Sequence, residues 1–273
     1  MINIMFAGNY KVFDGMLIAS LSILKHCKEP ITAYILTMDL QEENEAYKPI
    51  NAKHTEFLNN LYKNENSQSK VELIDLTDLY KKEFKNCPKV ESNYTPYTFL
   101  RLLADQIDGL PDKILYLDTD VVANGNISEL YSIDIKDYEI GGIRDYYGKV
   151  FFDSKYVNAG VLLFNMPMLR ETKMLNKAMH LCATKKIFLN DQTAINKMTV
   201  KKKILPNKFN EQKKLKKDTV IRHFSMTLKF FPRFKKQNIK PWHIEDVHNI
   251  LKIHEFDDIL NEYLELKKQN NFD

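Results

Sequence analysis

Short apolar runs alternate with helical patterns along the first part of the chain, and this alternation restricts the fold more than any other feature. Strand-like runs at residues 3–7, 31–38 and 71–76 are separated by helical patterns at 13–26 and 42–64. The order strand, helix, strand, helix, strand predicts an α/β sheet with parallel pairs. In such sheets ligands bind at the carboxyl ends of the strands. Candidate binding residues are therefore expected just after strands.

The same alternation continues further along the chain. Pro96 suits the first turn of a helix predicted over 95–107, and residues 113–117 form a nearly continuous apolar run of the kind found in central strands. That strand is expected to stop at Asp118. A further strand is predicted within 160–165. Helices are predicted over 169–182, 191–198 and 250–268, the last with Leu251, Phe256, Ile259, Leu260, Tyr263 and Leu264 on its apolar side.

The composition indicates a folded protein without a disulfide framework or a membrane span. The chain has 273 residues, of which 44% are hydrophobic, and this is enough apolar material for one main core. Cys27, Cys87 and Cys182 lie far apart without CxxC spacing, so neither a disulfide framework nor a thiolate metal site is expected. The N-terminus lacks the features of a signal peptide, and no apolar run reaches the roughly 18 residues of a membrane span. A cytoplasmic location is expected.

Basic residues cluster at 201–217 and at 229–240, although the net charge is only +4. The simplest interpretation is a solvated face; the alternatives are a phosphate-bearing ligand or peripheral contact with the anionic inner face of a membrane. No helix-turn-helix, zinc-finger or RNP pattern accompanies the charge, so no nucleic-acid partner is expected. The second cluster is mixed with Phe230, Phe231, Phe234 and Trp242.

Two carboxylates stand at the end of the predicted central strand. Asp118 and Asp120 are two residues apart, and alternate residues of an extended chain share a face, so both can reach one cation. Their hard oxygen ligands suit Mg²⁺ or Mn²⁺. Such a metal can bridge two phosphate oxygens and neutralise charge on a departing diphosphate. Asp-x-Asp is short enough to occur by chance, and the alternative is a strand end with solvated carboxylates.

His223 follows a second β-like run, and a neutral imidazole can complete a carboxylate metal site. A single histidine in this position is also typical of a purely structural residue. Lys229 and Lys240 supply point charges that suit phosphate oxygens, although isolated lysines are usually solvated.

With these pieces in order, the sequence resembles the family 8 retaining glycosyltransferases, which include bacterial lipopolysaccharide galactosyl- and glucosyltransferases. The match covers most of the chain. It rests on residues 6–10 (Phe-Ala-Gly-Asn-Tyr), 94–97 (Tyr-Thr-Pro-Tyr), 101–103 (Arg-Leu-Leu), 117–120 (Leu-Asp-Thr-Asp), 158–161 (Asn-Ala-Gly-Val), 190–192 (Asn-Asp-Gln), His223 and 240–242 (Lys-Pro-Trp).

The resemblance implies a GT-A fold, in which a Rossmann-like mixed sheet is flanked by helices and followed by a small helical C-terminal region. Residues 1–225 would form the catalytic domain that binds the nucleotide sugar, and 226–273 an extension packed on or beside it. Asp118, Asp120 and His223 would bind Mn²⁺ or Mg²⁺.

The resemblance also assigns donor contacts and catalytic candidates. Ala7, Asn9 and Tyr10 would hold the uridine; Arg101 would lie near the ribose, diphosphate or sugar; Asn158 and Ala159 would contact the sugar; and Lys229 or Lys240 would contact phosphate. Gln192, Asp191 and Asp145 are the catalytic candidates, with Gln192 near the reacting carbon. Gly8 stands where the family commonly has an acidic residue, which weakens the expected preference for uracil.

The implied activity is transfer of glucose or galactose from a UDP-sugar to a glycan, lipid-linked or protein acceptor, that is, a hexosyltransferase. Two alternatives are kept. Leu117–Val122 also resembles the nucleophile motif of haloacid-dehalogenase phosphatases, in which Asp118 would be phosphorylated and Asp120 would act as the acid. A non-catalytic protein that binds sugar nucleotides would use the same residues without turnover.

Overall fold

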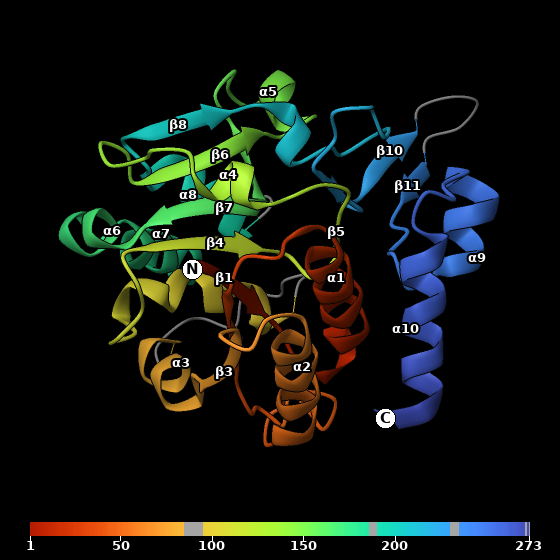
Figure 1. Ribbon diagram of the computed structural model, residues 1–273. Coiled ribbons are helices and arrows are strands. Elements are labelled where there is room, and N and C mark those ends of the chain that lie inside the picture. The colour runs from red at the N-terminus through yellow and green to blue at the C-terminus, as the bar shows by residue number, and fades with distance from the viewer. Residues whose placement is uncertain (85–94, 186–189, 230–234, 271, 273) are drawn as a thin grey trace.

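A seven-stranded mixed sheet forms the centre of the protein in a computed structural model, which describes residues 1–84, 95–185, 190–229, 235–270 and 272. The strand order is β3-β2-β1-β4-β7-β6-β8 (Figure 1). β4 pairs in parallel with β1 and antiparallel with β7. The strands are β1 (Ile2–Ala7), β2 (Ile31–Thr37), β3 (Lys70–Asp75), β4 (Lys113–Leu117), β6 (Ile140–Arg144), β7 (Val157–Asn165) and β8 (Lys202–Leu205). The predicted GT-A-type mixed sheet with flanking helices is confirmed.

The sheet separates two apolar cores because successive side chains of a strand point to opposite faces. In β4, Leu115 and Leu117 belong to one core, whereas Ile114 and Tyr116 belong to the other. All four are essentially inaccessible to water. A strand buried on both faces reads as a continuous apolar run, which explains why β4 is visible in the sequence.

Helices cover both faces (Figure 1). On one face lie α1 (Phe13–His26), α2 (Ala52–Glu65) and the C-terminal α10 (Asp257–Asn270), whose apolar residues join the first core. On the other face lie α3 (Thr77–Phe84), the 3₁₀ helix η2 (Pro96–Gln106), α6 (Met166–Thr172), α7 (Met174–Thr184) and α8 (Asn190–Met198).

Short elements complete the described chain. Two of them, β5 (Val121–Ala123) and β9 (Ile221–His223), pair with each other outside the large sheet. The others are η1 (Tyr10–Val12), α4 (Ser128–Tyr131), α5 (Gly148–Phe151), η3 (Asn207–Phe209), β10 (Thr227–Lys229), β11 (Lys235–Gln237), α9 (Ile244–Asp246) and the π-helical turn η4 (Val247–Leu251).

The C-terminal region contains α9, η4 and α10 together with the paired strands β10 and β11, so it is not purely helical. Ile253, Phe256 and Ile259 belong to the same core as α1. Lys267 of α10 binds Asp14 of α1, with Nζ and Oδ2 2.6 Å apart. The region therefore packs on the main sheet. The domain boundary between residues 225 and 226 stays a prediction.

Several predicted helices have different limits. The helix predicted over 42–64 begins only at Ala52, because Asn51 caps it by accepting the backbone N–H of His54. The helix predicted over 169–182 is broken at Lys173, which has a φ of 54°. The helix predicted over 95–107 is present as the 3₁₀ helix η2, Pro96–Gln106.

The prediction for 250–268 is also corrected. A regular helix begins only at Asp257, because Lys252 adopts a left-handed conformation that ends η4. Leu264 is 47% exposed instead of lying on the apolar side. Five residues considered above lie outside the described residues: Cys87, Tyr94, Phe230, Phe231 and Phe234.

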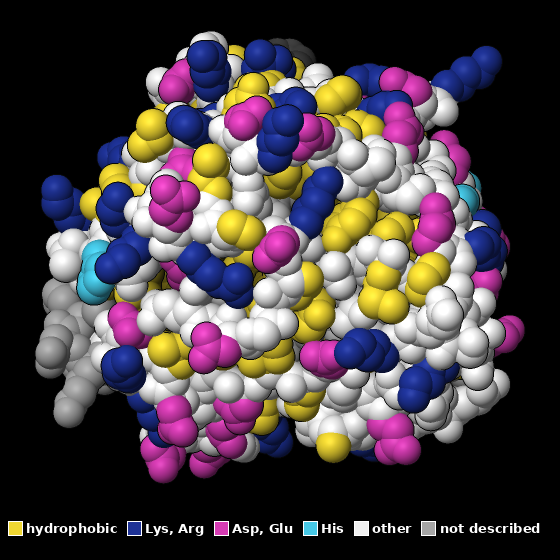
Figure 2. Space-filling view, turned by 60° about the vertical axis from the view of Figure 1, so that its left-hand side comes forward, with side chains coloured by type: hydrophobic (Ala, Val, Ile, Leu, Met, Phe, Trp, Pro, Cys, Tyr) yellow, Lys and Arg dark blue, Asp and Glu magenta, His cyan; other side chains and the backbone are white. Residues whose placement is uncertain are grey.

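The surface shows no broad region of one charge on the face drawn in Figure 2, where basic and acidic side chains are interspersed. Within the basic cluster at 201–217, Lys208 binds Glu129 and Lys216 binds Glu211. Two of the eight lysines in that cluster are therefore paired with carboxylates. Among the described helices, none has the length and apolar character needed to cross a membrane.

Asp105 near the end of η2 provides a test of the packing between η2 and α7. Its Oδ2 accepts the backbone N–H of Asn176, whereas its buried Oδ1 has no partner among the described residues. Burial raises the pKa of Asp105 to about 6. Because this value is above that of the unfolded chain, the group opposes folding above pH 6 and ceases to do so as the pH falls below about 4.

We expect Asp105→Asn to raise the free energy of unfolding by about 1–2 kcal/mol at pH 7.5 and by much less near pH 4.5, after allowance for partial exposure. Denaturant unfolding at the two pH values measures this difference. Asp108→Asn, at a nearby exposed carboxylate, is the control. An equal effect of Asp105→Asn at both pH values would contradict the assignment.

Candidate active site

Asp118 stands where the central strand ends. β4 pairs with β7 through Leu117 and Val161, and the backbone N–H of Asp118 donates to the carbonyl of Gly160 at 2.8 Å. This pairing sets Asp118 beside residues 158–160. The antiparallel register thus joins two segments that the sequence places far apart.

The β5–β9 pair places His223 beside the two carboxylates. Val121 pairs with His223, and the backbone N–H of Phe224 donates to the carbonyl of Asp120 at 2.9 Å. His223 Nε2 lies 3.1 Å from Asp120 Oδ1 and 3.9 Å from Asp118 Oδ2. Imidazole and both carboxylates therefore face a common point.

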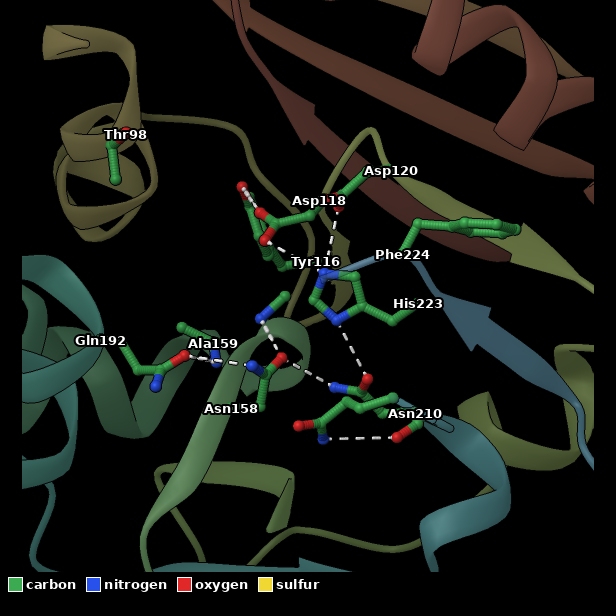
Figure 3. A network of polar contacts seen from close by, with 12 residues as sticks. Thr98, Tyr116, Asp118, Asp120, Asn158, Ala159, Gln192, Asn210, His223 and Phe224 are labelled. Atoms are coloured by element: carbon green, nitrogen blue, oxygen red, sulfur yellow. Dashed lines mark hydrogen bonds and ion pairs between the residues drawn. The ribbon is translucent and has the colours of Figure 1, made fainter. Parts of the chain in front are cut away.

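A chain of amides fixes the orientation of the His223 ring (Figure 3). The Asp145 carboxylate can only accept, so Asn158 turns Nδ2 toward it, at 3.0 Å from Oδ2. Asn158 Oδ1 then accepts from Asn210 Nδ2 at 2.9 Å, and Asn210 Oδ1 lies 3.1 Å from His223 Nδ1. Asn210 Oδ1 can only accept, so Nδ1 of His223 carries a proton, and Nε2 is the ring nitrogen that faces Asp118 and Asp120.

These residues fit a divalent cation. Asp118, Asp120 and His223 each offer one ligand atom, and the three atoms lie within 4.8 Å of one another. Two carboxylate oxygens and one imidazole nitrogen suit Mn²⁺ in particular, because Mg²⁺ prefers oxygen alone. A neutral ring held through Nδ1 is the usual state of a metal-binding histidine.

Arg101 balances the buried acids around this point. Its NH1 lies 3.0 Å from Asp118 Oδ1, and its Nε lies 3.2 Å from Asp191 Oδ2. The guanidinium is 4.5 Å above the ring of Tyr116, whose hydroxyl donates to Asp118. Burial raises the pKa of Asp191 to about 6, although the charge of Arg101 opposes the rise.

Lys240 approaches the same carboxylates from the C-terminal region. Its Nζ lies 2.5 Å from Asp120 Oδ2. Burial by itself would raise the pKa of Asp120, but the charge of Lys240 and the contact with His223 bring the pKa below its usual value. Trp242 packs so closely on α1 that a Cβ added to Gly15 would lie 2.3 Å from its ring. The chain needs glycine there for this segment to approach the site.

A pocket of about 330 Å³ opens over these groups, which is large enough for a small ligand. Several of the residues assigned from the resemblance line it together: Ala7, Asn9, Arg101, Asp118, Asp120, Ala159, Asp191, Gln192 and Lys240. Asp145, Asn158 and His223 stand behind this lining and are joined to it by hydrogen bonds or ion pairs. Their individual roles stay predictions.

Two of the assigned residues stand apart from the others. Tyr10 does not line the described pocket; the ammonium groups of Lys11 and Lys48 lie 6.0 and 5.8 Å from the centre of its ring. The backbone of Lys229 is part of β10, but its side chain lies outside the described residues. Lys240 is thus the assigned lysine that the structure places at the carboxylates.

Sequence reasoning missed other residues of the site. Asn210 is 1% exposed and orients His223, yet it follows a short 3₁₀ turn and belongs to no recognisable motif. Tyr116 contacts Asp118 from within the apolar run of β4, where it reads only as a core residue. Trp242 lines the pocket, and its position after Lys240-Pro241 was the one available signal.

Comparison with known proteins agrees with this geometry. The model of glycosyl transferase family 8 matches residues 2–246. The chain belongs to this family. Its curated relatives include glycosyltransferase GlyA of Streptococcus pneumoniae, 31% identical over 175 residues that cover 64% of this chain and 22% of GlyA. Lipopolysaccharide 1,3-galactosyltransferase of Salmonella typhimurium is 29% identical over 198 residues, or 65% of this chain and 56% of that protein.

Solved glycosyltransferase structures are similar to this chain over almost its whole length and share its GT-A fold. The galactosyltransferase LgtC in complex with donor and acceptor sugar analogues has a TM-score of 0.68 at 18% identity, and the match covers 96% of both chains. GlyE of Streptococcus pneumoniae has a TM-score of 0.63 at 20% identity, covering 98% of this chain and 65% of that one. The chain spans 22% of the length of GlyA and 52% of the length of a Haemophilus influenzae relative described as a glycosyltransferase.

Gly160 tests the geometry of the three ligands. A Cβ added there would lie 2.3 Å from His223 Cε1 and 2.7 Å from Asp118 Oδ2. We expect Gly160→Ala to displace one of these side chains and to weaken Mn²⁺ binding by about 10- to 100-fold in calorimetric titration. Gly125→Ala is the control, because its Cβ would meet only ordinary contacts at 3.6 Å and beyond. Unchanged Mn²⁺ affinity in a folded Gly160→Ala protein would show that the three residues do not form the cation site.

Proposed function

We propose that this chain is a retaining hexosyltransferase that moves glucose or galactose from a UDP-sugar to a glycan acceptor and uses Mn²⁺ or Mg²⁺ held by Asp118, Asp120 and His223. The family membership supports glycosyl transfer, and relatives named as lipopolysaccharide galactosyl- and glucosyltransferases support a hexose.

The observation that carries this proposal is the position of the three ligand atoms. They lie within 4.8 Å of one another, and two of the residues, Asp118 and Asp120, line a pocket that extends to the carboxyl end of β1 at Ala7 and Asn9. A diphosphate bound to the cation would extend into this pocket, with its nucleoside toward β1. When bound, the divalent cation would offset the negative charge that develops on the leaving diphosphate.

The protein side chains would orient the donor. Lys240 Nζ, now on Asp120, is close enough to the cation site to take a phosphate oxygen instead. Gln192 Oε1 accepts from the backbone N–H of Ala159 at 3.0 Å and from Asn158 Nδ2 at 3.2 Å. These contacts fix the Gln192 amide beside the pocket, where it would face the anomeric carbon of the sugar.

The geometry favours attack by the acceptor on the same face from which the diphosphate leaves. A covalent route needs a free, well-placed carboxylate. Here Asp145 Oδ2 accepts from both Asn158 and Gln192, while Asp191 is held by Arg101. In same-face attack the acceptor oxygen bonds to the anomeric carbon as the bond to diphosphate breaks, and the departing diphosphate takes the acceptor's proton.

The phosphatase alternative is not favoured. Its motif belongs on the first strand of a domain, whereas Asp118 follows β4 in the middle of the sheet. It also needs a second acidic pair near the first. Asp257 and Asp258 instead begin α10, where they contact His248 and Lys25. A non-catalytic sugar-nucleotide binder differs from the proposal only in turnover.

The acceptor, including a lipid-linked or protein acceptor, and a peripheral contact with a membrane stay predictions. Residues 228–242, which contain the second basic cluster and its aromatic residues, are one candidate for such a contact and are described only in part. Its described portion includes Lys240 and Trp242, which are turned toward the pocket. These two residues support a role in donor binding instead.

The first test measures UDP release from UDP-glucose, UDP-galactose and UDP-N-acetylglucosamine with Mn²⁺. We expect release from one hexose donor, which falls at least about 100-fold in Asp118→Asn and in Asp120→Asn because the leaving diphosphate loses its cation. Asp137→Asn, at an exposed carboxylate, should release UDP at the normal rate. Absence of release together with absence of donor binding in calorimetry would refute the proposal.

A second test compares the two lysines. Lys240→Met should lower kcat/KM for the donor by about 100-fold, because a charge near the departing diphosphate is lost. Lys229→Met is the matched variant and should change kcat/KM by no more than about twofold. The reverse order would mean that Lys229 contacts the phosphate, and circular dichroism would confirm that both proteins fold.

A further inference from the structure

A second group of metal-ligating side chains lies at the start of α10, well outside the candidate active site. His248 comes from the turn η4, His254 from the loop that follows, and Asp257 from the first position of α10. Each offers one ligand atom, and the three atoms lie within 4.8 Å of one another. No part of the proposed sugar transfer uses these residues.

The distances suit a small cation with mixed nitrogen and oxygen ligands. His248 Nε2 lies 2.7 Å from Asp257 Oδ1, and His254 Nδ1 lies 3.3 Å from Asp257 Oδ2. Around tetrahedral zinc, with bonds of about 2.0–2.2 Å, neighbouring ligand atoms stand roughly 3.3 Å apart. Only small side-chain adjustments would therefore bring the three atoms onto one ion.

The two imidazole rings also favour a metal. They are stacked, with centroids 4.6 Å apart and planes inclined by 21°. One ring nitrogen of each histidine lies beside the Asp257 carboxylate, so the two rings and the carboxylate can bind one ion together. Two nitrogen ligands and one carboxylate suit Zn²⁺ and are unsuited to Mg²⁺ or Ca²⁺, which take oxygen.

The backbone holds the three residues in place before any ion binds. Ile253 and Phe256, on either side of His254, are 7% and 2% exposed and belong to the main core. The backbone N–H of Ile253 donates to the carbonyl of Val247, and that of Asp257 donates to the carbonyl of His254. These contacts fix the loop between η4 and α10.

The charged residues next to His254 and Asp257 leave the ligand atoms of the group accessible to solvent. Asp258 is directed to α1, where it pairs with Lys25. Glu255 accepts the backbone N–H of His254 and adds a negative charge nearby. The side chains of His248, Asp257 and His254 are 29%, 40% and 61% exposed, so an ion can enter and a water molecule can complete its coordination.

We propose that His248, His254 and Asp257 form a second metal site, which takes Zn²⁺ and fastens the start of α10 to η4. The site has three protein ligands and one position for water. Its occupation stabilises the packing of α10 on α1 and does not depend on the activity of the first site.

The test uses Asp118→Asn/Asp120→Asn as the parent protein, so that Zn²⁺ cannot bind at the first site. Calorimetric titration with ZnCl₂ should show about one equivalent bound with micromolar affinity. At about 100-fold excess over the dissociation constant, the melting temperature should rise by about 5 °C. Cys27 and Cys182 are buried and should not contribute.

Adding His254→Ala or Asp257→Asn to the parent should abolish both the binding and the rise in melting temperature. His180→Ala, at an exposed histidine on α7, is the matched control and should retain both. His254 is exposed, so its removal should leave the metal-free melting temperature unchanged, which separates lost binding from misfolding. Failure of the parent to bind Zn²⁺, or full binding by the His254→Ala protein, would overturn the proposal and leave simple histidine–aspartate pairs.

Discussion

The antiparallel pairing of β4 with β7, together with the pairing of β5 with β9, is the constraint on which the site depends. The first pairing brings Asp118 against Gly160 through a backbone hydrogen bond, and the second brings His223 against Asp120. Carboxylates packed this closely repel one another and are costly to bury. Arg101 pairs with Asp118 and Lys240 pairs with Asp120, so each carboxylate has a cationic partner that offsets this cost.

Polar groups behind the pocket fix the orientation of the His223 ring. The acceptor-only carboxylate of Asp145 sets the amide of Asn158, which sets Asn210, which sets the tautomer of His223. In Asn158 and in Asn210 both the amide nitrogen and the amide oxygen have at least one hydrogen-bond partner, as a low-dielectric interior requires. Asp145 therefore helps to position His223, in addition to any contact with sugar.

Residues that follow a strand or lie in an apolar period were predictable, and residues that act across the fold were not. The limits of α1 and the end of β4 follow from local patterns. The long helix expected over 42–64 was wrong at its start, because the capping by Asn51 outweighs helical composition. Leu264 was assigned to the apolar face, but α10 buries Ile259, Leu260 and Tyr263 and leaves Leu264 47% exposed.

The sequence alone determined the class of sheet and the Asp118–Asp120 pair, because strand periodicity and an acidic pair at a strand end are local properties. The family followed from the resemblance that several ordered motifs carry together. Tertiary structure decided which distant residues join them. Asn210 and the β5–β9 register are set by pairing between segments about a hundred residues apart, and no local pattern encodes that pairing. The same holds for His248, His254 and Asp257, since only the folded turn before α10 brings both rings to one carboxylate.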